Sequence, residues 1–100
     1  MTEPPYRLAF DRTLKHQIEQ LQGKLRQEVR QRIANLAREP RPSYARELRG
    51  YPDVYRCWLS DARYRLIWAV DDTARRVEIY YVGRKPDYDA LLGGSESVEE

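Results

Sequence analysis

The fold is decided by two adjoining segments, LRGYPDVYRCWL at residues 48–59 and YRLIWAVDD at residues 64–72. They predict a turn, a strand, a short turn and a second strand, with arginines interrupting runs that are otherwise apolar and aromatic. Because side chains alternate between the two faces of a strand, an arginine at a regular strand position stands on a sheet face. Arginines among aromatic residues on one face suit a ligand that carries phosphates and bases.

One strand and two helices are predicted upstream of these segments. Residues 6–10 alternate as a first strand, and Asp11 suits the N-cap of the helix that follows. Gly23 marks a break, and a second helix runs from about Lys24 to Arg38, ending before Pro40. Two antiparallel helices joined near Gly23 form an αα-hairpin. Their apolar stripes are Leu14, Ile18 and Leu21 in the first helix, and Leu25, Val29, Ile33, Leu36 and Ala37 in the second.

Three strands are predicted downstream of the helices, at Val54–Leu59, Tyr64–Val70 and Val77–Val82. The loops at Ser60–Arg63 and Asp71–Ala74 are short enough for hairpins. The order of N-terminal strand, two-helix hairpin and three-stranded antiparallel meander predicts an α+β domain with both helices on one sheet face.

The length of the chain limits the number of domains, and its charge limits the kinds of partner that we expect. One hundred residues make one domain, which we place at residues 1–94, followed by an acidic flexible tail at residues 95–100. Arginine dominates the basic residues, and its planar guanidinium suits phosphate and stacks on bases. The net charge of +2 becomes +5 when the three glutamates of the tail are left out. That charge is enough to attract RNA or an acidic partner, and a mildly basic domain without such a partner is the alternative.

The small numbers of cysteines and histidines exclude several kinds of metal site and catalytic mechanism. Cys57 is the only cysteine, which excludes an internal disulfide and a cysteine-rich metal site, and we expect it to face the core. His16 is the only histidine, which excludes a multi-histidine metal site and a two-histidine ribonuclease mechanism. We therefore predict no metal and no cofactor. No signal peptide or membrane span is visible in the sequence, so we expect a cytoplasmic protein with no membrane partner.

Strand parity places three residues together. Arg56, Trp58 and Arg65 fall on the side of the sheet that the helices leave open, where facing neighbours lie about 5 Å apart and two guanidiniums could straddle one phosphate. In the alternative, these arginines are exposed strand residues that pair with nearby carboxylates. Trp58 could stack a base or pack against a partner protein. The apolar sets that suit the helix side are Tyr55, Cys57 and Leu59, and Leu66, Trp68 and Val70.

The same segments carry a family likeness. Residues 48–56 and 64–68, with the Val-Gly-Arg-Lys run at residues 82–85, resemble the RelE branch of the RelE/ParE superfamily of bacterial toxins. The likeness covers the chain from Tyr6 to about Leu92. It implies a RelE-like fold, a toxin of a type II toxin–antitoxin system, and a cognate antitoxin as partner in a toxin–antitoxin hetero-oligomer. RelE-type toxins are ribosome-dependent messenger-RNA endonucleases, so the likeness also implies the ribosome and messenger RNA as partners, and growth arrest through inhibited translation.

The resemblance assigns roles to individual residues. Arg56 takes the place of a basic residue on the second strand, and Arg65 matches the arginine of the Tyr-Arg-Leu strand. Lys85 matches the basic pair after Val-Gly. Tyr88 is the candidate for the late tyrosine of the family, although it falls a few positions early. Trp58 departs from the family pattern, because a second basic residue is expected there.

The implied chemistry uses no metal. The RNA supplies its own nucleophile, a 2′-hydroxyl that attacks the adjacent phosphate and expels the 5′-oxygen, while fixed cations stabilise the developing charge. Tyr88 is the candidate for proton transfer. We predict an endoribonuclease with two sets of site residues: catalytic Arg56, Arg65, Lys85 and Tyr88, and RNA-binding Arg49, Trp58 and Arg84.

Two other functions stay open. A ParE-like inhibitor that binds DNA gyrase and cuts no RNA would share the fold, and a catalytically decayed toxin could persist as an antitoxin-binding module. The arginines on the open face favour the ribonuclease, whereas Trp58 in place of a second cation weakens that preference. In each case we expect the antitoxin to dock on the helical hairpin and the sheet edge.

Overall fold

A five-stranded sheet carries the fold of residues 5–93, the part of the chain that the computed structural model describes. The strand order is β1-β5-β4-β3-β2, in which β1 lies parallel to β5 and every other neighbouring pair is antiparallel. The predicted α+β class, helical hairpin and meander are confirmed, and the predicted tail at residues 95–100 lies outside the described residues. The elements are β1 (Arg7–Ala9), α1 (Arg12–Glu19), α2 (Gly23–Leu36), β2 (Arg46–Glu47), β3 (Val54–Trp58), β4 (Tyr64–Asp71), β5 (Arg76–Arg84) and α3 (Tyr88–Leu92).

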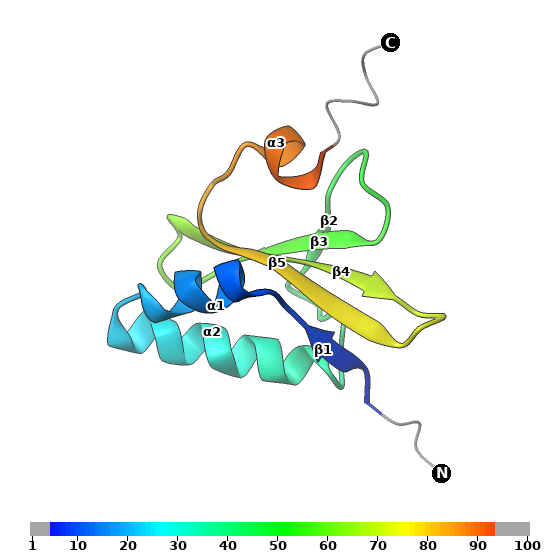
Figure 1. Ribbon diagram of the computed structural model, residues 1–100, viewed down its shortest axis with the longest axis horizontal. Helices are drawn as coiled ribbons and strands as arrows, with labels where there is room; N and C mark the ends of the chain where they lie inside the picture. The colour runs from blue at the N-terminus through cyan, green and yellow to red at the C-terminus, as the bar shows by residue number, and fades with distance from the viewer. Residues whose placement is uncertain (1–4, 94–100) are drawn as a thin grey trace.

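The helices divide between the two faces of the sheet. Figure 1 shows the α1–α2 hairpin on one face, as predicted, and the short α3 on the other. We call the second face the α3 face. Within residues 5–93, no helix combines the length and apolar character needed to cross a membrane. The main core lies between the hairpin and the sheet and consists of Leu14, Ile18, Leu21, Leu25, Val29, Ile33, Leu36, Cys57, Leu59, Leu66, Trp68, Val70, Val77, Ile79 and Val82.

Local chemistry sets the ends of the helices. Asp11 is the N-cap of α1, as predicted, and its carboxylate accepts a hydrogen bond from the Leu14 amide at 2.9 Å. The break between the helices lies slightly before the predicted position, because Gly23 is the first residue of α2 and Gln22 is its N-cap. The second helix ends at Leu36, ahead of the proline-containing connection.

The strand β2 was not predicted. It has only two residues, too few to show an alternating pattern, and both are exposed. It pairs with β3, with Arg46 opposite Arg56 and Glu47 opposite Tyr55. This pairing extends the meander by one strand beyond the prediction and brings a further arginine beside the two predicted ones.

A β-bulge in β5 changes the direction of the side chains at its end. Ile67 pairs with Tyr81 and Trp68 with Ile79, so Tyr80 is an extra residue on β5. Before the bulge Ile79 faces the main core, and after it Val82 does, three positions later rather than two. The bulge therefore turns Tyr81 to the α3 face. Without the bulge, simple alternation along β5 would have placed Tyr81 in the core.

A network of side chains ties the loops at one end of the sheet. The Arg41 guanidinium donates to both carboxylate oxygens of Asp72 at 3.0 and 3.1 Å, to Asp53 at 3.2 Å and to the Tyr55 hydroxyl at 2.7 Å. Tyr6 also donates to Asp72, at 2.6 Å. The hydrogen bonds from Arg41 and then from Tyr6 hold the pKa of Asp72 below its usual value, because they favour the charged carboxylate.

We expect Asp72→Asn to lower the free energy of unfolding at neutral pH, because asparagine cannot form the ion pair with Arg41. The pKa of Asp72 is lower in the folded than in the unfolded state. Its stabilising contribution is therefore fully present above about pH 4 and is lost as the pH falls through the folded pKa. Urea unfolding of wild type and variant should give midpoints that converge at acidic pH.

The pairing with Arg41 supplies the control for this experiment. Arg41→Met should cost less stability in the Asp72→Asn background than in the wild type, because the ion pair with Asp72 is already gone and only the bonds to Asp53 and Tyr55 remain to be lost. Fully additive losses, or a difference between wild type and Asp72→Asn that is unchanged at low pH, would contradict the assignment.

Candidate functional site

Three of the predicted site residues lie together on the α3 face. Trp58 on β3 and Arg65 on β4 are directly opposite each other in the sheet. The Arg65 Cζ lies 4.0 Å from the centroid of the Trp58 ring, and the Arg56 Cζ lies 5.8 Å from it. Both contacts are cation–π interactions. The Trp58 side chain nevertheless remains 46% exposed. The structure thus brings Arg56, Trp58 and Arg65 together as strand parity predicts.

The fourth member of this cluster comes from α3. Arg65 Nη1 donates a hydrogen bond of 2.5 Å to the Tyr88 hydroxyl, which joins a predicted catalytic arginine to the predicted catalytic tyrosine. Asp87 caps α3 by accepting a hydrogen bond from the Ala90 amide. The Tyr51 hydroxyl donates to Asp89, which ties α3 to the loop between β2 and β3. Tyr88 is therefore held over the end of the sheet where Arg65 lies.

One atom of Arg65 is not satisfied. Its Nε is buried and has no hydrogen-bond partner among residues 5–93. A buried donor without a partner costs about 1–3 kcal/mol, so such an atom needs an explanation. An anion at the edge of the guanidinium would provide the missing acceptor.

A second tyrosine adjoins the cluster, and it was missed in the sequence. Tyr81 lies over Gly83, the residue directly opposite Arg65: a Cβ at Gly83 would be only 2.8 Å from the Tyr81 hydroxyl oxygen. That hydroxyl donates to the Arg84 carbonyl at 2.7 Å. Burial raises the pKa of Tyr81, and the nearby Tyr88 phenol raises it further. Tyr81 reaches this place only through the bulge, which no pattern in the sequence announces.

Arg46 is the second residue that was missed. It stands opposite Arg56, on the same face of the sheet, and its guanidinium donates to the Ala45 carbonyl at 3.1 Å. Like charges that face each other across a strand pair are unfavourable. Their pairing at an exposed sheet edge makes this end of the α3 face strongly positive. Only the assignment of β2 could have revealed it.

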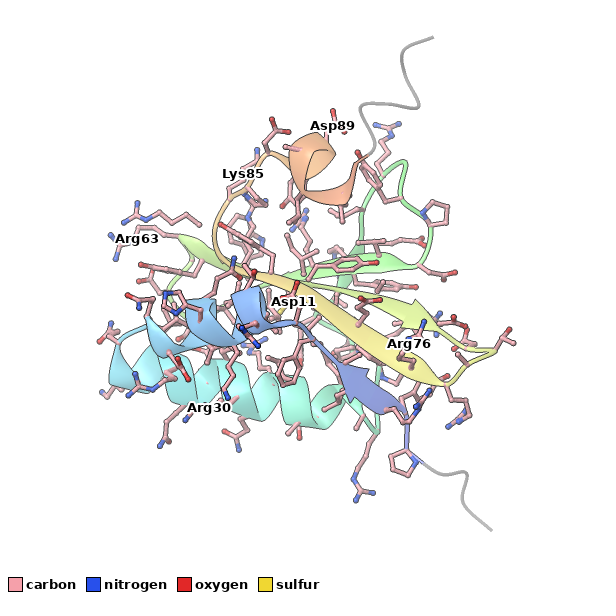
Figure 2. All side chains as sticks on the ribbon, in the orientation of Figure 1. Asp11, Arg30, Arg63, Arg76, Lys85 and Asp89 are labelled. Atoms are coloured by element: carbon pink, nitrogen blue, oxygen red, sulfur yellow. The ribbon has the colours of Figure 1, made fainter. Side chains whose placement is uncertain are left out.

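The remaining predicted residues are more dispersed. Lys85 is exposed on the segment that connects β5 to α3, as Figure 2 shows. Arg84 lies apart from the cluster, since it pairs with Tyr64 on the helix side of the sheet and its Cζ is 5.8 Å from the Tyr64 ring centroid. Arg49 is exposed in the loop between β2 and β3. Within residues 5–93, no group of three or more His, Cys, Asp or Glu residues is arranged to hold a metal ion.

Acidic side chains gather at the opposite end of the α3 face, where Arg41 and Arg76 pair with three of them. A groove of about 510 Å³ lies there, beside the turn between β4 and β5. Four carboxylates line it, together with the single cation Arg76. These carboxylates belong to Asp53, Asp71, Asp72 and Glu78.

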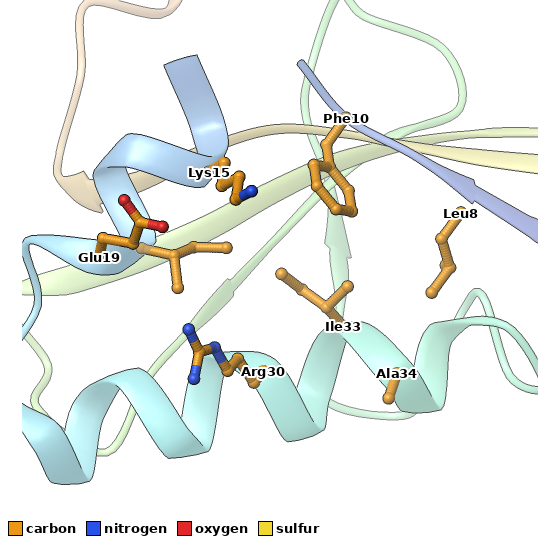
Figure 3. Close-up of a pocket in the computed structure, with 8 residues that line it drawn as sticks. Leu8, Phe10, Lys15, Glu19, Arg30, Ile33 and Ala34 are labelled. Carbon is orange, nitrogen blue, oxygen red and sulfur yellow. The ribbon is translucent and has the colours of Figure 1, made fainter. Parts of the chain in front are cut away.

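A separate apolar groove lies away from the α3 face, between β1, α1 and α2. Its volume is about 350 Å³, and Leu8, Phe10, Ile33 and Ala34 form much of its lining (Figure 3). Phe10, one of the large apolar side chains at the surface, is 50% exposed. The groove adjoins β1, which is an edge strand of the sheet.

Comparison with known proteins then tests the resemblance. No protein-family model matches the sequence, and no curated protein matches it. Solved structures do match. A double arginine-to-alanine mutant of the E. coli toxin RelE in the free state is 25% identical, with a TM-score of 0.71 over 96% of this chain and 99% of that chain. A chain of the intact E. coli RelBE toxin–antitoxin complex is 28% identical, with a TM-score of 0.70 over 81% of this chain and 98% of that chain.

The chain has the RelE-like toxin fold. A more distant match has the same fold: a chain of the archaeal RelE–RelB complex from Pyrococcus horikoshii is 19% identical, with a TM-score of 0.67 over 83% of this chain and 98% of that chain. Coverage of almost the whole of each of these chains means that the RelE-like fold accounts for the hairpin, the sheet and their order. The predicted family likeness is confirmed at the level of the fold.

Proposed function

We propose that this protein is a type II toxin that cleaves messenger RNA at the cluster of Arg56, Trp58, Arg65 and Tyr88. One observation carries the proposal: the guanidinium of Arg65, bonded to the Tyr88 hydroxyl at 2.5 Å, has a buried Nε without an acceptor. A phosphate of RNA would supply that acceptor once the side chains that cover Nε move aside. The matches to RelE toxins in toxin–antitoxin complexes support the toxin role. The toxin domain would comprise residues 1–94 and act in the cytoplasm.

The chemistry follows from the residue types in the cluster. Arginine presents planar N–H donors that match two phosphate oxygens, so Arg65 and Arg56 would stabilise the charge that develops on the attacked phosphate. The nucleophile would be the RNA 2′-hydroxyl, and no metal would be required. Tyr88 would exchange a proton with the reacting oxygens, and the exposed Lys85 would neutralise the neighbouring phosphate.

The ribosome would complete this site. Arginine almost never deprotonates and tryptophan is only a donor, so tyrosine is the one residue type in the cluster able to act as an acid or base. The cluster is also largely open, with Trp58 46% exposed. Cleavage therefore would be slow in solution and fast only where the ribosome orients the messenger RNA, because correct orientation supplies much of the rate.

The cognate antitoxin would dock on the apolar groove between β1, α1 and α2. The half-exposed Phe10 gives the groove an apolar anchor, and the edge strand β1 offers unpaired backbone groups to a partner strand. This surface combines the helical hairpin with the sheet edge. The groove is separate from the α3 face. An antitoxin segment bound in the groove would therefore leave the catalytic cluster uncovered, and other antitoxin segments could bind there.

Arg65→Ala should abolish growth arrest while the protein stays folded and binds its antitoxin. Loss of one donor to a transition-state anion lowers cleavage by about 10²- to 10³-fold. Induced expression followed by primer-extension mapping of messenger-RNA ends measures the effect. Arg63→Ala, an exposed arginine paired with Asp61 in the neighbouring turn, is the matched control and should remain toxic. A soluble, fully toxic Arg65→Ala variant would refute the proposal. The proposal would also fail if the wild-type protein left messenger RNA intact and inhibited DNA supercoiling by gyrase.

Tyr88→Phe should lower single-turnover cleavage on programmed ribosomes by about 10²- to 10⁴-fold, the usual contribution of a general acid or base. Binding to the ribosome should be retained, because the ring and most of α3 stay in place. Tyr80→Phe is the control, since Tyr80 lines the acidic groove at the other end of the same face. Cleavage by Tyr88→Phe at the wild-type rate would exclude a proton-transfer role for this phenol.

Phe10→Asp should weaken neutralisation by the cognate antitoxin, because a charge replaces the apolar anchor of the groove. We expect Kd to rise at least about tenfold, the equivalent of about 1.4 kcal/mol. Titration of purified toxin with antitoxin measures Kd, and co-expression should leave the variant toxic. Tyr44→Ser, at another exposed aromatic residue that does not line the groove, is the control. Unchanged neutralisation of Phe10→Asp would place the antitoxin elsewhere.

A further inference from the structure

Trp58 stands where the RelE resemblance leads us to expect a cation, and its contacts suggest what it does instead. It lies directly opposite Arg65 in the β3–β4 ladder, so the two side chains leave the sheet as immediate neighbours. The guanidinium carbon of Arg65 is 4.0 Å from the centroid of the indole, closer than any other cation–π contact among residues 5–93. At this distance the guanidinium is in van der Waals contact with the aromatic face.

Stacking leaves a defined part of the guanidinium available. All of its N–H donors lie in the plane of the group and point outward from its edge. Nη1 is engaged by the Tyr88 hydroxyl, whereas Nε has no partner among the described residues. The indole lies against the guanidinium and the Tyr88 hydroxyl takes Nη1, so with Nε buried it is Nη2 that is left to meet an anion.

We propose that Trp58 is a positioning residue for Arg65: it holds the guanidinium against its ring so that Nη2 meets one RNA phosphate. The inference rests on the proposed function, since it names how that site takes its substrate. An arginine on a flexible stem loses rotamer freedom when it binds a phosphate, and a stacked arginine has already lost it. Trp58 thus compensates for the cation missing at its own position by fixing the neighbouring Arg65.

Base stacking is the competing role for Trp58. Its side chain is 46% exposed, so part of the ring is accessible to a base. The two roles differ in what the RNA must contribute. Stacking needs a base on the RNA, whereas positioning of Arg65 needs only the phosphate.

Two uncleavable oligonucleotides separate these roles: a fully 2′-O-methylated RNA, and the same strand with every base removed. Positioning predicts that Trp58→Ala weakens binding of both by a similar factor, about three- to tenfold. Trp58→Phe should restore most of the affinity, because a smaller aromatic face still supports the guanidinium. Trp58→Lys should not restore it, although it adds a charge. A loss confined to the base-bearing strand, or binding by Trp58→Lys at or above the wild-type affinity, would overturn the inference.

Acrylamide quenching of tryptophan fluorescence tests the stacking without RNA. Trp68 is fully buried, so Trp58 dominates the accessible signal. Arg65→Ala should uncover one face of Trp58 and raise the quenching constant, and Arg63→Ala should not. Equal quenching in wild type and Arg65→Ala would show that the stack is absent in solution.

The same variants distinguish failure of this inference from failure of the proposed function. If Arg65→Ala binds both strands as wild type does, Arg65 does not take RNA phosphate and the proposed function fails, whatever the quenching shows. If Arg65→Ala weakens binding and Trp58→Ala does not, the function stands and the positioning role is wrong.

Discussion

The single extra residue in β5 is the constraint that decides which side chains of this strand face the core and which reach the α3 face. Ile79 and Val82 must both face the main core, and they are separated by three positions, so the strand can satisfy both only through the bulge at Tyr80. The same irregularity turns Tyr81 toward Arg65 and Arg84 toward the helices. A requirement of the core, the burial of two apolar side chains, thereby decides which polar side chains reach the α3 face.

Strands with regular alternation could be predicted from the sequence, whereas the bulge and the very short strand could not. Arg56, Trp58 and Arg65 were grouped correctly because the β3–β4 hairpin has a short loop and unbroken alternation, which together fix its register. The bulge and the two-residue β2 leave no periodic signal, so Tyr81 and Arg46 were missed. The fold was predictable from the order of its elements, whereas the membership of the site required the pairing of its strands.

The residues of the candidate site stand on elements that differ in how strongly they are held to the rest of the fold. Arg56, Trp58 and Arg65 stand on paired strands of the sheet, whose backbone is fixed by the ladder. Tyr88 stands on a helix of five residues with no buried side chain, held by the hydrogen bonds to Arg65 and between Tyr51 and Asp89. Elements with few buried contacts open most easily. The arginines and Trp58 are therefore held by the sheet itself, whereas Tyr88 depends on a short helix that a few hydrogen bonds attach to the sheet.

The α3 face is divided by charge, with arginines at the Trp58 end and four carboxylates at the Asp71 end. A protein field of this kind acts on a charged ligand before any contact forms. Three of the four carboxylates are paired with Arg41 or Arg76, so the positive charge of this face is concentrated at the Trp58 end, and an anion that approaches the face is drawn to that end. The uneven charge of the face therefore selects where along the strands an anionic ligand arrives, before any side chain touches it.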